Sequence, residues 1–322
     1  MDLTTRYLGL ELRNPLVASA GPFGRTVDGV RRLADGGVGA VVLASLFEEQ
    51  IEHEETASDG WRYSPSGYLD LVSKASAEVD VPVIASLNGC TTGGWTAYAS
   101  AIEQAGASAI ELNLYFPQAD PLTPGGEVEQ RHIEVLSTVK AAVTVPVAVK
   151  ISPYLSSPGD LALRLDRVGA DGLVLFNRFM QTGIDPETLR VDATFALSRP
   201  ADAAFGRMWI ARLRGAVSAS LAASTGVEEA RDVAAYLLAG ADVVMTTSAL
   251  LRHGPEHADT LVRGLTGWMG RKGFDNLTAV RGLLAEPAAR AGARVPGPEH
   301  DRTGYITALH KATGKYVLGD DD

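Results

Sequence analysis

Three polar side chains stand near the ends of apolar runs, where burial without a partner is costly. Lys150 lies in the run PVAVKIS, Asn113 in IELNLY and Asn177 in LVLFNR. Each alone has an ordinary explanation, either a lysine that reaches solvent or an asparagine that ties down a loop. At the ends of strands of one sheet, however, the three would converge on one polar site for an anionic or electron-rich ligand.

Two further segments supply small and hydroxyl-bearing residues after apolar runs, Ser224–Val227 (STGV) and Thr246–Ser248 (TTS). Backbone N–H groups beside small residues, followed by the start of a helix, are typical of phosphate sites. STGV alone is a weak motif, because a Ser or Thr that merely caps the next helix gives the same pattern. The segments predict a phosphate site, with helix capping as the alternative.

Eight short apolar runs alternate along the chain with amphipathic, helix-like stretches. The runs are Pro15–Ala20, Gly39–Ser45, Pro82–Asn88, Ala109–Tyr115, Pro146–Ser152, Gly172–Asn177, Val217–Ala223 and Val243–Ala249. Continuous apolar character is typical of parallel strands covered by helices. Several helical stretches end in glycine (QAGAS, RVGAD, LAGAD), as expected for a left-handed C-cap. This alternation predicts a single (β/α)8 TIM barrel, with an open doubly wound sheet as the alternative.

The segments outside this repeat have their own predictions. RYLGLELRNP near the N-terminus reads as a short hairpin that plugs the bottom of the barrel. Phe47–Leu69 and Gln181–Ala203 are insertions expected at the C-terminal face, where barrels keep their active sites. We expect residues 1–283 to form one barrel domain. Residues 284–322, rich in alanine, proline and charge, would form a C-terminal extension that is either packed or partly disordered.

Composition restricts the classes of partner. The net charge of −10 and pI near 5.1 argue against nucleic acid and anionic membranes, because both need clustered cations. A single cysteine, Cys90, excludes an intrachain disulfide and a cysteine-ligated iron–sulfur cluster. The chain shows no signal-peptide pattern and no window near the roughly 18 apolar residues of a membrane span. We expect a cytoplasmic protein that binds no metal.

The same segments resemble the dihydroorotate dehydrogenase family, in order over residues 1–272. LGLELRNPLVASAGP resembles the family's opening hairpin and first strand, and ELNLYFP its asparagine-bearing fourth strand. PVAVKISP resembles the strand with its flavin-contacting lysine, and ASTGVEEARDVAAYLLAGADVVMTTSALLRHGP its phosphate-binding end. The chain is most similar to a divergent, dihydroorotate dehydrogenase-like branch. This resemblance implies FMN as the cofactor.

The resemblance also implies roles for particular residues. Ala20 and Gly21 would lie against the flavin ring, with hydride passing between a substrate carbon and flavin N5. The other implied contacts, to the flavin, its substrate or its phosphate, are Ser45, Asn88, Asn113, Lys150, Asn177, Gly226, Thr247 and Ser248. The activity implied is oxidation of dihydroorotate to orotate, a step of pyrimidine biosynthesis.

The chain departs from the family where the proton chemistry belongs. Phe116 stands at the position of the usual cysteine or serine base and cannot accept a proton. Two residues further, Gln118 replaces an asparagine. Tyr115, Asp120 and Cys90 are the other candidates for proton transfer, and a base other than the family's points to a substrate other than dihydroorotate.

A second departure concerns substrate binding. The family's substrate-contacting lysine is missing, with Gly24 and Ala44 at the matching points. Arg25 and Arg178 are nearby cations that could meet an anionic substrate instead, although both also read as solvated loop residues.

Three functions follow from these patterns. The first is an FMN oxidoreductase with a small planar or carboxylated substrate. The second is a catalytically silent flavin-binding partner of another redox protein. The third is a flavin-free barrel lyase that uses Lys150 as a Schiff-base amine. The expected partners are a small-molecule substrate, with a redox protein and a homodimer as further alternatives.

Overall fold

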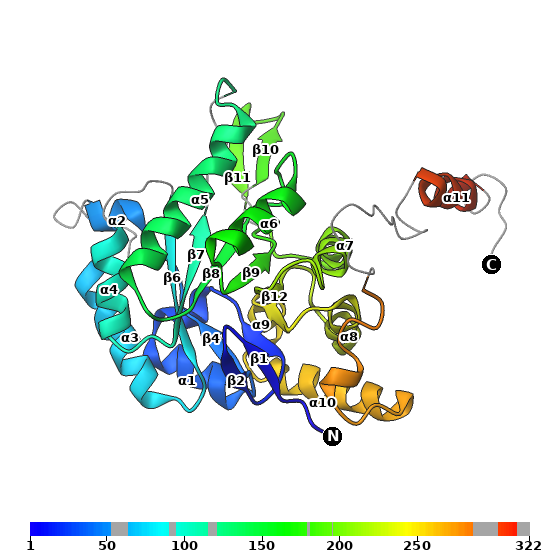
Figure 1. Cartoon of the computed structure of the whole chain (residues 1–322), viewed down its shortest axis with the longest axis horizontal. Helices are drawn as coiled ribbons and strands as arrows, with labels where there is room; N and C mark the ends of the chain where they lie inside the picture. Colours follow the sequence, from blue (N-terminus) through cyan, green and yellow to red (C-terminus); the bar gives the residue numbers. More distant parts are fainter. Residues whose placement is uncertain are drawn as a thin grey trace.

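Within the described residues of the computed structural model, eight parallel strands close into a ring (Figure 1). They are β3 (Leu16–Ala18), β4 (Ala40–Val42), β6 (Val83–Gly89), β7 (Ala109–Leu114), β8 (Val147–Ile151), β9 (Gly172–Leu175), β12 (Ser220–Ala223) and β13 (Val243–Thr246). Pairing of β13 with β3 and of β4 with β6 completes the ring. The predicted (β/α)8 barrel is confirmed, and the open sheet is wrong. The structure describes residues 1–52, 64–89, 95–114, 121–178, 181–194, 196–285 and 302–313.

Each of the predicted apolar runs contains one barrel strand, although some ends differ. Residues 217–219 lie outside β12, in the loop that precedes it, and α9 (Ser248–His253) begins inside the last predicted run. Apolar character continues into these segments because they too pack against the barrel, so hydrophobicity alone does not mark where a strand ends.

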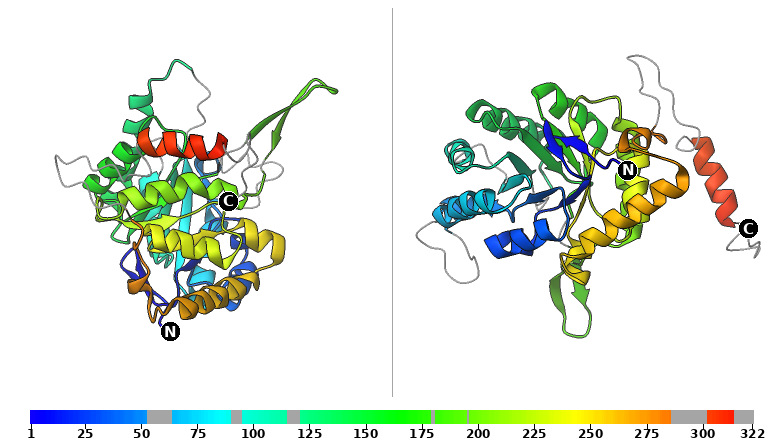
Figure 2. Two further views of the ribbon diagram at one scale, coloured as in Figure 1. Left: turned by 90° about the vertical axis from the view of Figure 1, so that its right-hand side faces the viewer. Right: turned by 90° about the horizontal axis from the view of Figure 1, so that it is seen from below.

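Helices surround the strands, as the view from below in Figure 2 shows. They are α1 (Val27–Asp35), α2 (Glu48–Glu52), α3 (Pro65–Glu78), α4 (Trp95–Gln104), α5 (Gly125–Ala142), α6 (Pro158–Val168), α7 (Ala203–Leu213), α8 (Ala230–Ala239) and α10 (His257–Lys272). The predicted glycine caps are present: Gly169 and Gly240 end α6 and α8 with φ of +98° and +116°. No helix in the described part of the chain is long and apolar enough to cross a membrane.

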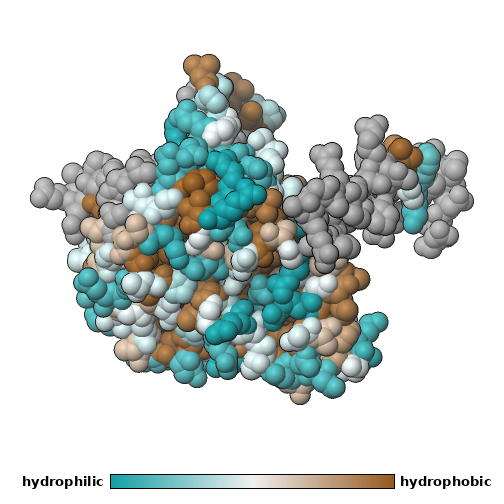
Figure 3. Space-filling view, in the orientation of Figure 1, coloured by the Kyte–Doolittle hydropathy of each residue, from teal (hydrophilic) through white to brown (hydrophobic). Residues whose placement is uncertain are grey.

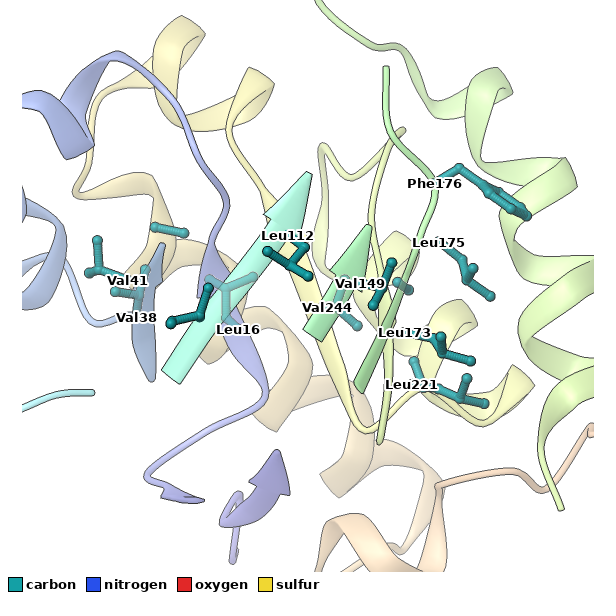
Figure 4. Close-up of a cluster of buried hydrophobic side chains, with 14 of the residues drawn as sticks. Leu16, Val38, Val41, Leu112, Val149, Leu173, Leu175, Phe176, Leu221 and Val244 are labelled. Carbon is teal, nitrogen blue, oxygen red and sulfur yellow. The ribbon is translucent and has the colours of Figure 1, made fainter. Parts of the chain in front are cut away.

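The strands divide their side chains between two cores, because successive residues of a strand point to opposite faces. The outward set, which includes Leu112, Val149 and Leu173, packs against the helices (Figure 4). The inward set, such as Ile84 and Val174, fills the lower part of the barrel. A polar site must therefore use inward positions nearer the C-terminal ends of the strands.

The N-terminal hairpin closes the bottom of the barrel, as predicted. It consists of β1 (Thr5–Tyr7) and β2 (Leu10–Leu12), which pair antiparallel and lie across the ring in the view from below (Figure 2). Tyr7, Leu8 and Leu12 are at most 2% exposed and join the inner core.

The described parts of the two predicted insertions lie at the C-terminal face. The first is more regular than expected: β5 (Leu46–Phe47) adds to β6, and α2 follows it. α3 begins at Pro65, with the Ser64 side chain accepting from the Gly67 N–H. Part of the predicted loop is thus helical, and the signal missed was a capping serine followed by proline.

The second insertion forms a hairpin of β10 (Gln181–Asp185) and β11 (Arg190–Thr194), which projects from the barrel (Figure 2). It is followed by a short 3-10 helix, η2 (Pro200–Asp202). Figure 3 shows hydrophobic residues near the top of the view, where this hairpin and its neighbours lie in Figure 1. In the hairpin, Ile184 and Val191 pair across the two strands and are both exposed.

The end of the predicted barrel domain is in contact with α8. After η3 (Leu277–Ala279), the Gly282 N–H donates to the Leu237 carbonyl at 2.9 Å. Beyond it the structure describes α11 (Arg302–Thr313). A domain boundary at residue 283, and the packing of the extension that follows, stay predictions.

The hairpin plug gives a first testable prediction. Replacing Leu12 with alanine should lower the free energy of unfolding by about 2–5 kcal/mol, because a cavity opens in the inner core. Urea denaturation measures this change. Glu11→Ala is the matched control on the exposed face of the same strand and should change stability by less than about 0.5 kcal/mol. Equal effects of the two substitutions would contradict a supporting role for the plug.

Candidate active site

A pocket of about 610 Å³ opens at the C-terminal ends of the barrel strands, within the range of small-ligand sites. It collects every described residue with a predicted cofactor or substrate role. These are Ala20, Gly21, Arg25, Ser45, Asn88, Asn113, Lys150, Asn177, Arg178, Gly226, Thr247 and Ser248. The structure thus brings together residues from across the chain, while their binding roles stay predictions.

The residues around the predicted base position are not among them. Cys90, Tyr115, Phe116, Gln118 and Asp120 lie outside the described residues. Their proposed part in proton transfer therefore stays a prediction that rests on the sequence.

Lys150 occupies an inward position on β8, and its side chain does not extend into solvent. It is only 6% exposed, and Nζ lies 3.2 Å from Ser19 Oγ and 3.4 Å from Glu111 Oε1. The ordinary explanation, a lysine that reaches solvent, is wrong. Since an ammonium has three N–H donors and these contacts use two, one donor remains for a ligand in the pocket.

Asn113 and Asn177 meet across the mouth of the barrel. Asn177 Nδ2 donates to Asn113 Oδ1 at 2.6 Å, and the Asn177 backbone N–H donates to the Ile151 carbonyl. The two asparagine side chains therefore bond to each other, whereas the ordinary explanation had each asparagine bonded to loop backbone. With Lys150 on the intervening strand, the three polar groups converge as the sequence predicts.

Ser45 is held by a network from β6 and α3. Its hydroxyl lies 2.8 Å from Ser86 Oγ, and the Tyr68 hydroxyl lies 2.8 Å from the Ser86 N–H and 3.0 Å from its carbonyl. Asn88 follows two residues after Ser86 and so shares its inward face. A buried tyrosine thus supports β6 at Ser86, the partner of Ser45, two residues before Asn88.

The predicted phosphate end contains a glycine that no other residue could replace without movement. Gly226 has φ of +72°, and a Cβ there would lie 2.7 Å from Ala203 N and 2.8 Å from the Arg199 carbonyl oxygen. Its N–H donates to Ser198 Oγ at 3.2 Å, and Ser198 Oγ donates to Ser248 Oγ at 3.0 Å. Sequence reasoning missed Ser198, because nothing in its insertion indicates that it reaches this loop.

Helix capping does not explain the STGV segment. α8 begins only at Ala230, and its N-cap is Glu229, which forms a capping box with Asp232. STGV instead folds as a loop held from beneath by α8, because the Tyr236 hydroxyl lies 2.9 Å from the Thr225 carbonyl oxygen. The alternative raised by the sequence is therefore wrong.

The ends of β3 and β13 approach closely at the predicted flavin-ring position. Thr247 Oγ1 donates to the Ser19 carbonyl at 2.8 Å. A Cβ on Gly21 would lie 2.5 Å from Thr247 Cγ2, so only glycine fits beside this side chain. The result is a wall of small residues that includes Ala20.

The two predicted substrate cations differ in their surroundings. Arg178 is already paired, with Nη1 3.0 Å from Asp202 Oδ2 and Nε 2.5 Å from the Ala196 carbonyl oxygen. Arg25 is exposed at the rim, and no carboxylate of the described residues forms an ion pair with it. Arg25 is therefore the more available partner for an anion. In the same part of the chain, no group of three or more His, Cys, Asp or Glu side chains could hold a metal ion.

The support beneath STGV can be tested directly. Tyr236→Phe should lower the free energy of unfolding by about 1–3 kcal/mol, because it leaves buried loop carbonyls without their donor. Urea denaturation measures the loss, and amide hydrogen exchange of residues 224–227 should accelerate. Tyr154→Phe, at an exposed tyrosine, is the control. An unchanged exchange rate in the Tyr236 variant would show that α8 does not hold the loop.

A solved structure shares this architecture. The chain matches the crystal structure of DHODH from Eimeria tenella in complex with ferulenol, with a TM-score of 0.68, 16% identity and 89% coverage of both chains. At this identity the match supports the fold alone.

Sequence comparisons go further. The chain is 27% identical over 304 residues to the catalytic subunit of dihydroorotate dehydrogenase B (NAD(+)) from Methanothermobacter thermautotrophicus, covering 87% of this chain and 98% of that protein. It is 28% identical over 297 residues to dihydroorotate dehydrogenase A (fumarate) from Limosilactobacillus reuteri, covering 86% and 96%. The family model for dihydroorotate dehydrogenase matches residues 59–269, more than half of the chain. The chain therefore belongs to the dihydroorotate dehydrogenase family, as a divergent, oxidoreductase-like member.

Proposed function

We propose that the protein binds FMN in the barrel-mouth pocket and acts as an oxidoreductase on a small, anionic substrate. The observation that carries this proposal is that one pocket is lined both by a loop suited to a phosphate and by a polar cluster. The glycine-based loop with Ser198 and Ser248 lines the same pocket as the Lys150, Asn113 and Asn177 cluster.

The residues present fit the cofactor. Gly226 and Gly21 line the pocket at points where a Cβ would collide with neighbouring protein atoms, so close packing of the pocket wall requires glycine at both. Ser248 and the loop around Gly226 would hold the phosphate. Lys150 has one N–H donor beyond its contacts to Ser19 and Glu111, which suits an electron-rich ring edge.

When bound, FMN supplies the hydride chemistry that side chains lack. The chain's own part is to bind, orient and exclude water. Asn113 and Asn177 fix each other's amide groups in the pocket, and Arg25 offers a cation to a substrate carboxylate at the rim. No residue is assigned to proton removal from the substrate, because Phe116 stands where the family has its base and the candidates Tyr115, Asp120 and Cys90 lie outside the described residues.

The relatives' names point to dihydroorotate as the first substrate to test, and to NAD(+) or fumarate as acceptors of those proteins. We propose a related substrate and slow turnover of dihydroorotate itself. The Methanothermobacter relative is a catalytic subunit, which supports a redox partner protein here. A single cysteine fits a reducing, cytoplasmic location, and a homodimer is retained from the sequence-based expectation.

The test is the absorbance spectrum of the purified protein, followed by anaerobic titration with dihydroorotate. We expect about one FMN per chain and very slow flavin reduction. A positioned base contributes about 10²–10⁴-fold, so Phe116→Cys should accelerate reduction markedly while leaving FMN content unchanged. Phe274→Cys, two residues beyond the end of α10, controls for an added thiol.

Three outcomes would separate the alternatives. Rapid reduction of the unmodified protein would contradict the assignment of Phe116. Bound FMN that no substrate or NAD(P)H reduces would favour a silent flavin-binding partner. A colourless protein that borohydride traps with a keto substrate would favour the Schiff-base lyase.

Arg25 gives a further prediction about the substrate. In the FMN-bound protein, Arg25→Gln should weaken binding of orotate, used as an anionic probe, about tenfold through loss of a charge-assisted contact. Arg178→Gln should have a smaller effect, because Asp202 already pairs with that charge. Titration followed by the flavin spectrum measures both, and Arg31→Gln on α1 is the control. Unchanged orotate affinity in the Arg25 variant would remove that residue from the site.

A further inference from the structure

One buried carboxylate contacts Lys150 but has been given no role of its own so far. Glu111 lies on β7 at an inward position between Ala109 and Asn113, and it is 0% exposed. Removing a carboxylate from water costs several kcal/mol unless its partners compensate. A neutral side chain of similar size would avoid this cost, so the charge itself calls for an explanation.

The partners of Glu111 compensate only in part. Oε1 lies 3.4 Å from Lys150 Nζ, at the long end of the range for a hydrogen-bonded ion pair. Oε2 is buried and has no hydrogen-bond partner among the described residues. Glu111 Oε2 is therefore an unsatisfied acceptor among the described residues, on the carboxylate whose other oxygen contacts Lys150.

A matching donor comes from the hairpin below. The Tyr7 hydroxyl is 0% exposed and likewise has no hydrogen-bond partner in the described part of the chain. Burial, and then the negative charge of Glu111, raises the pKa of Tyr7 well above its ordinary value, so the hydroxyl keeps its proton. The Tyr7 ring reaches the level of Glu111: a Cβ on Gly172 would lie 3.4 Å from Tyr7 Cε2 and 3.5 Å from Ala148 Cβ, and Ala148 is the residue of β8 that pairs with Glu111.

We propose that Glu111 is a positioning residue that, supported from below by Tyr7, holds the Lys150 ammonium at the floor of the pocket and offsets its charge toward bound flavin. This inference rests on the proposed binding of FMN. In this proposal, Tyr7, Glu111 and Lys150 together set how strongly the pocket favours the reduced cofactor.

Electrostatics gives the direction of the effect. Reduction increases the negative charge on the flavin ring, and a nearby cation stabilises that charge. A carboxylate 3.4 Å from the same cation cancels part of its field, and the dry interior makes the cancellation strong. Glu111 therefore lowers the reduction potential relative to a pocket that contains Lys150 alone.

The experiment measures the midpoint potential of the FMN-bound protein by spectroelectrochemistry. Glu111→Gln should favour the reduced form about tenfold, which for a two-electron couple is a rise of about 30 mV. Glu111→Asp draws the carboxylate back from Lys150 and should give a smaller rise of the same sign, which also serves if the glutamine variant does not fold. Glu129→Gln, at a buried carboxylate on α5 that pairs with Arg164, should leave the potential unchanged.

The role of Tyr7 is tested by a double-mutant cycle. Tyr7→Phe should shift the potential in the native background but not in the Glu111→Gln background, because its effect passes through the carboxylate. Stoichiometric FMN with an unmoved potential in the Glu111 variants would overturn the inference and leave the proposed function standing. A native protein without FMN would overturn both.

Discussion

The strict alternation of side chains along eight closed strands is the constraint on which the rest of the molecule depends. Each strand sends every second residue inward, so the barrel must fill a narrow interior from floor to mouth. Apolar residues and the hairpin fill the lower levels, with Tyr7, Leu8 and Leu12 at the base. Above them the inward positions become polar, at Glu111, Lys150 and Asn113. The same inward-facing positions thus form the core near the bottom of the barrel and the site near the C-terminal ends of the strands.

Much of this organisation could be predicted from the sequence, because it follows from local patterns. Continuous apolar runs gave the strands, and the glycines at 169 and 240 marked helix ends. Lys150, Asn113 and Asn177 were recognisable because polar residues in such runs are expensive to bury.

What could not be predicted depends on contacts between distant segments. Ser198 joins the loop at Gly226 from an insertion whose path no local pattern indicates. Glu111 escaped notice because a glutamate beside Asn113 reads as one more strand-end polar group, and its burial appears only when the barrel closes. The available charge of Arg25 and the paired charge of Arg178 likewise depend on whether a carboxylate such as Asp202 lies nearby.

The floor of the barrel joins the hairpin to residues more than 200 positions later in the chain. The Leu8 N–H donates to Ser220 Oγ, and Thr5 Oγ1 donates to the Asp242 carbonyl, across 212 and 237 positions of the chain. During synthesis the hairpin must therefore wait, with its apolar face uncovered, until most of the barrel has left the ribosome. Such long-range closure slows folding and exposes the nascent chain to association with other molecules. The inner core is therefore complete only once the hairpin packs against Ser220 and Asp242, so a chain that ends before these residues could not close the bottom of the barrel.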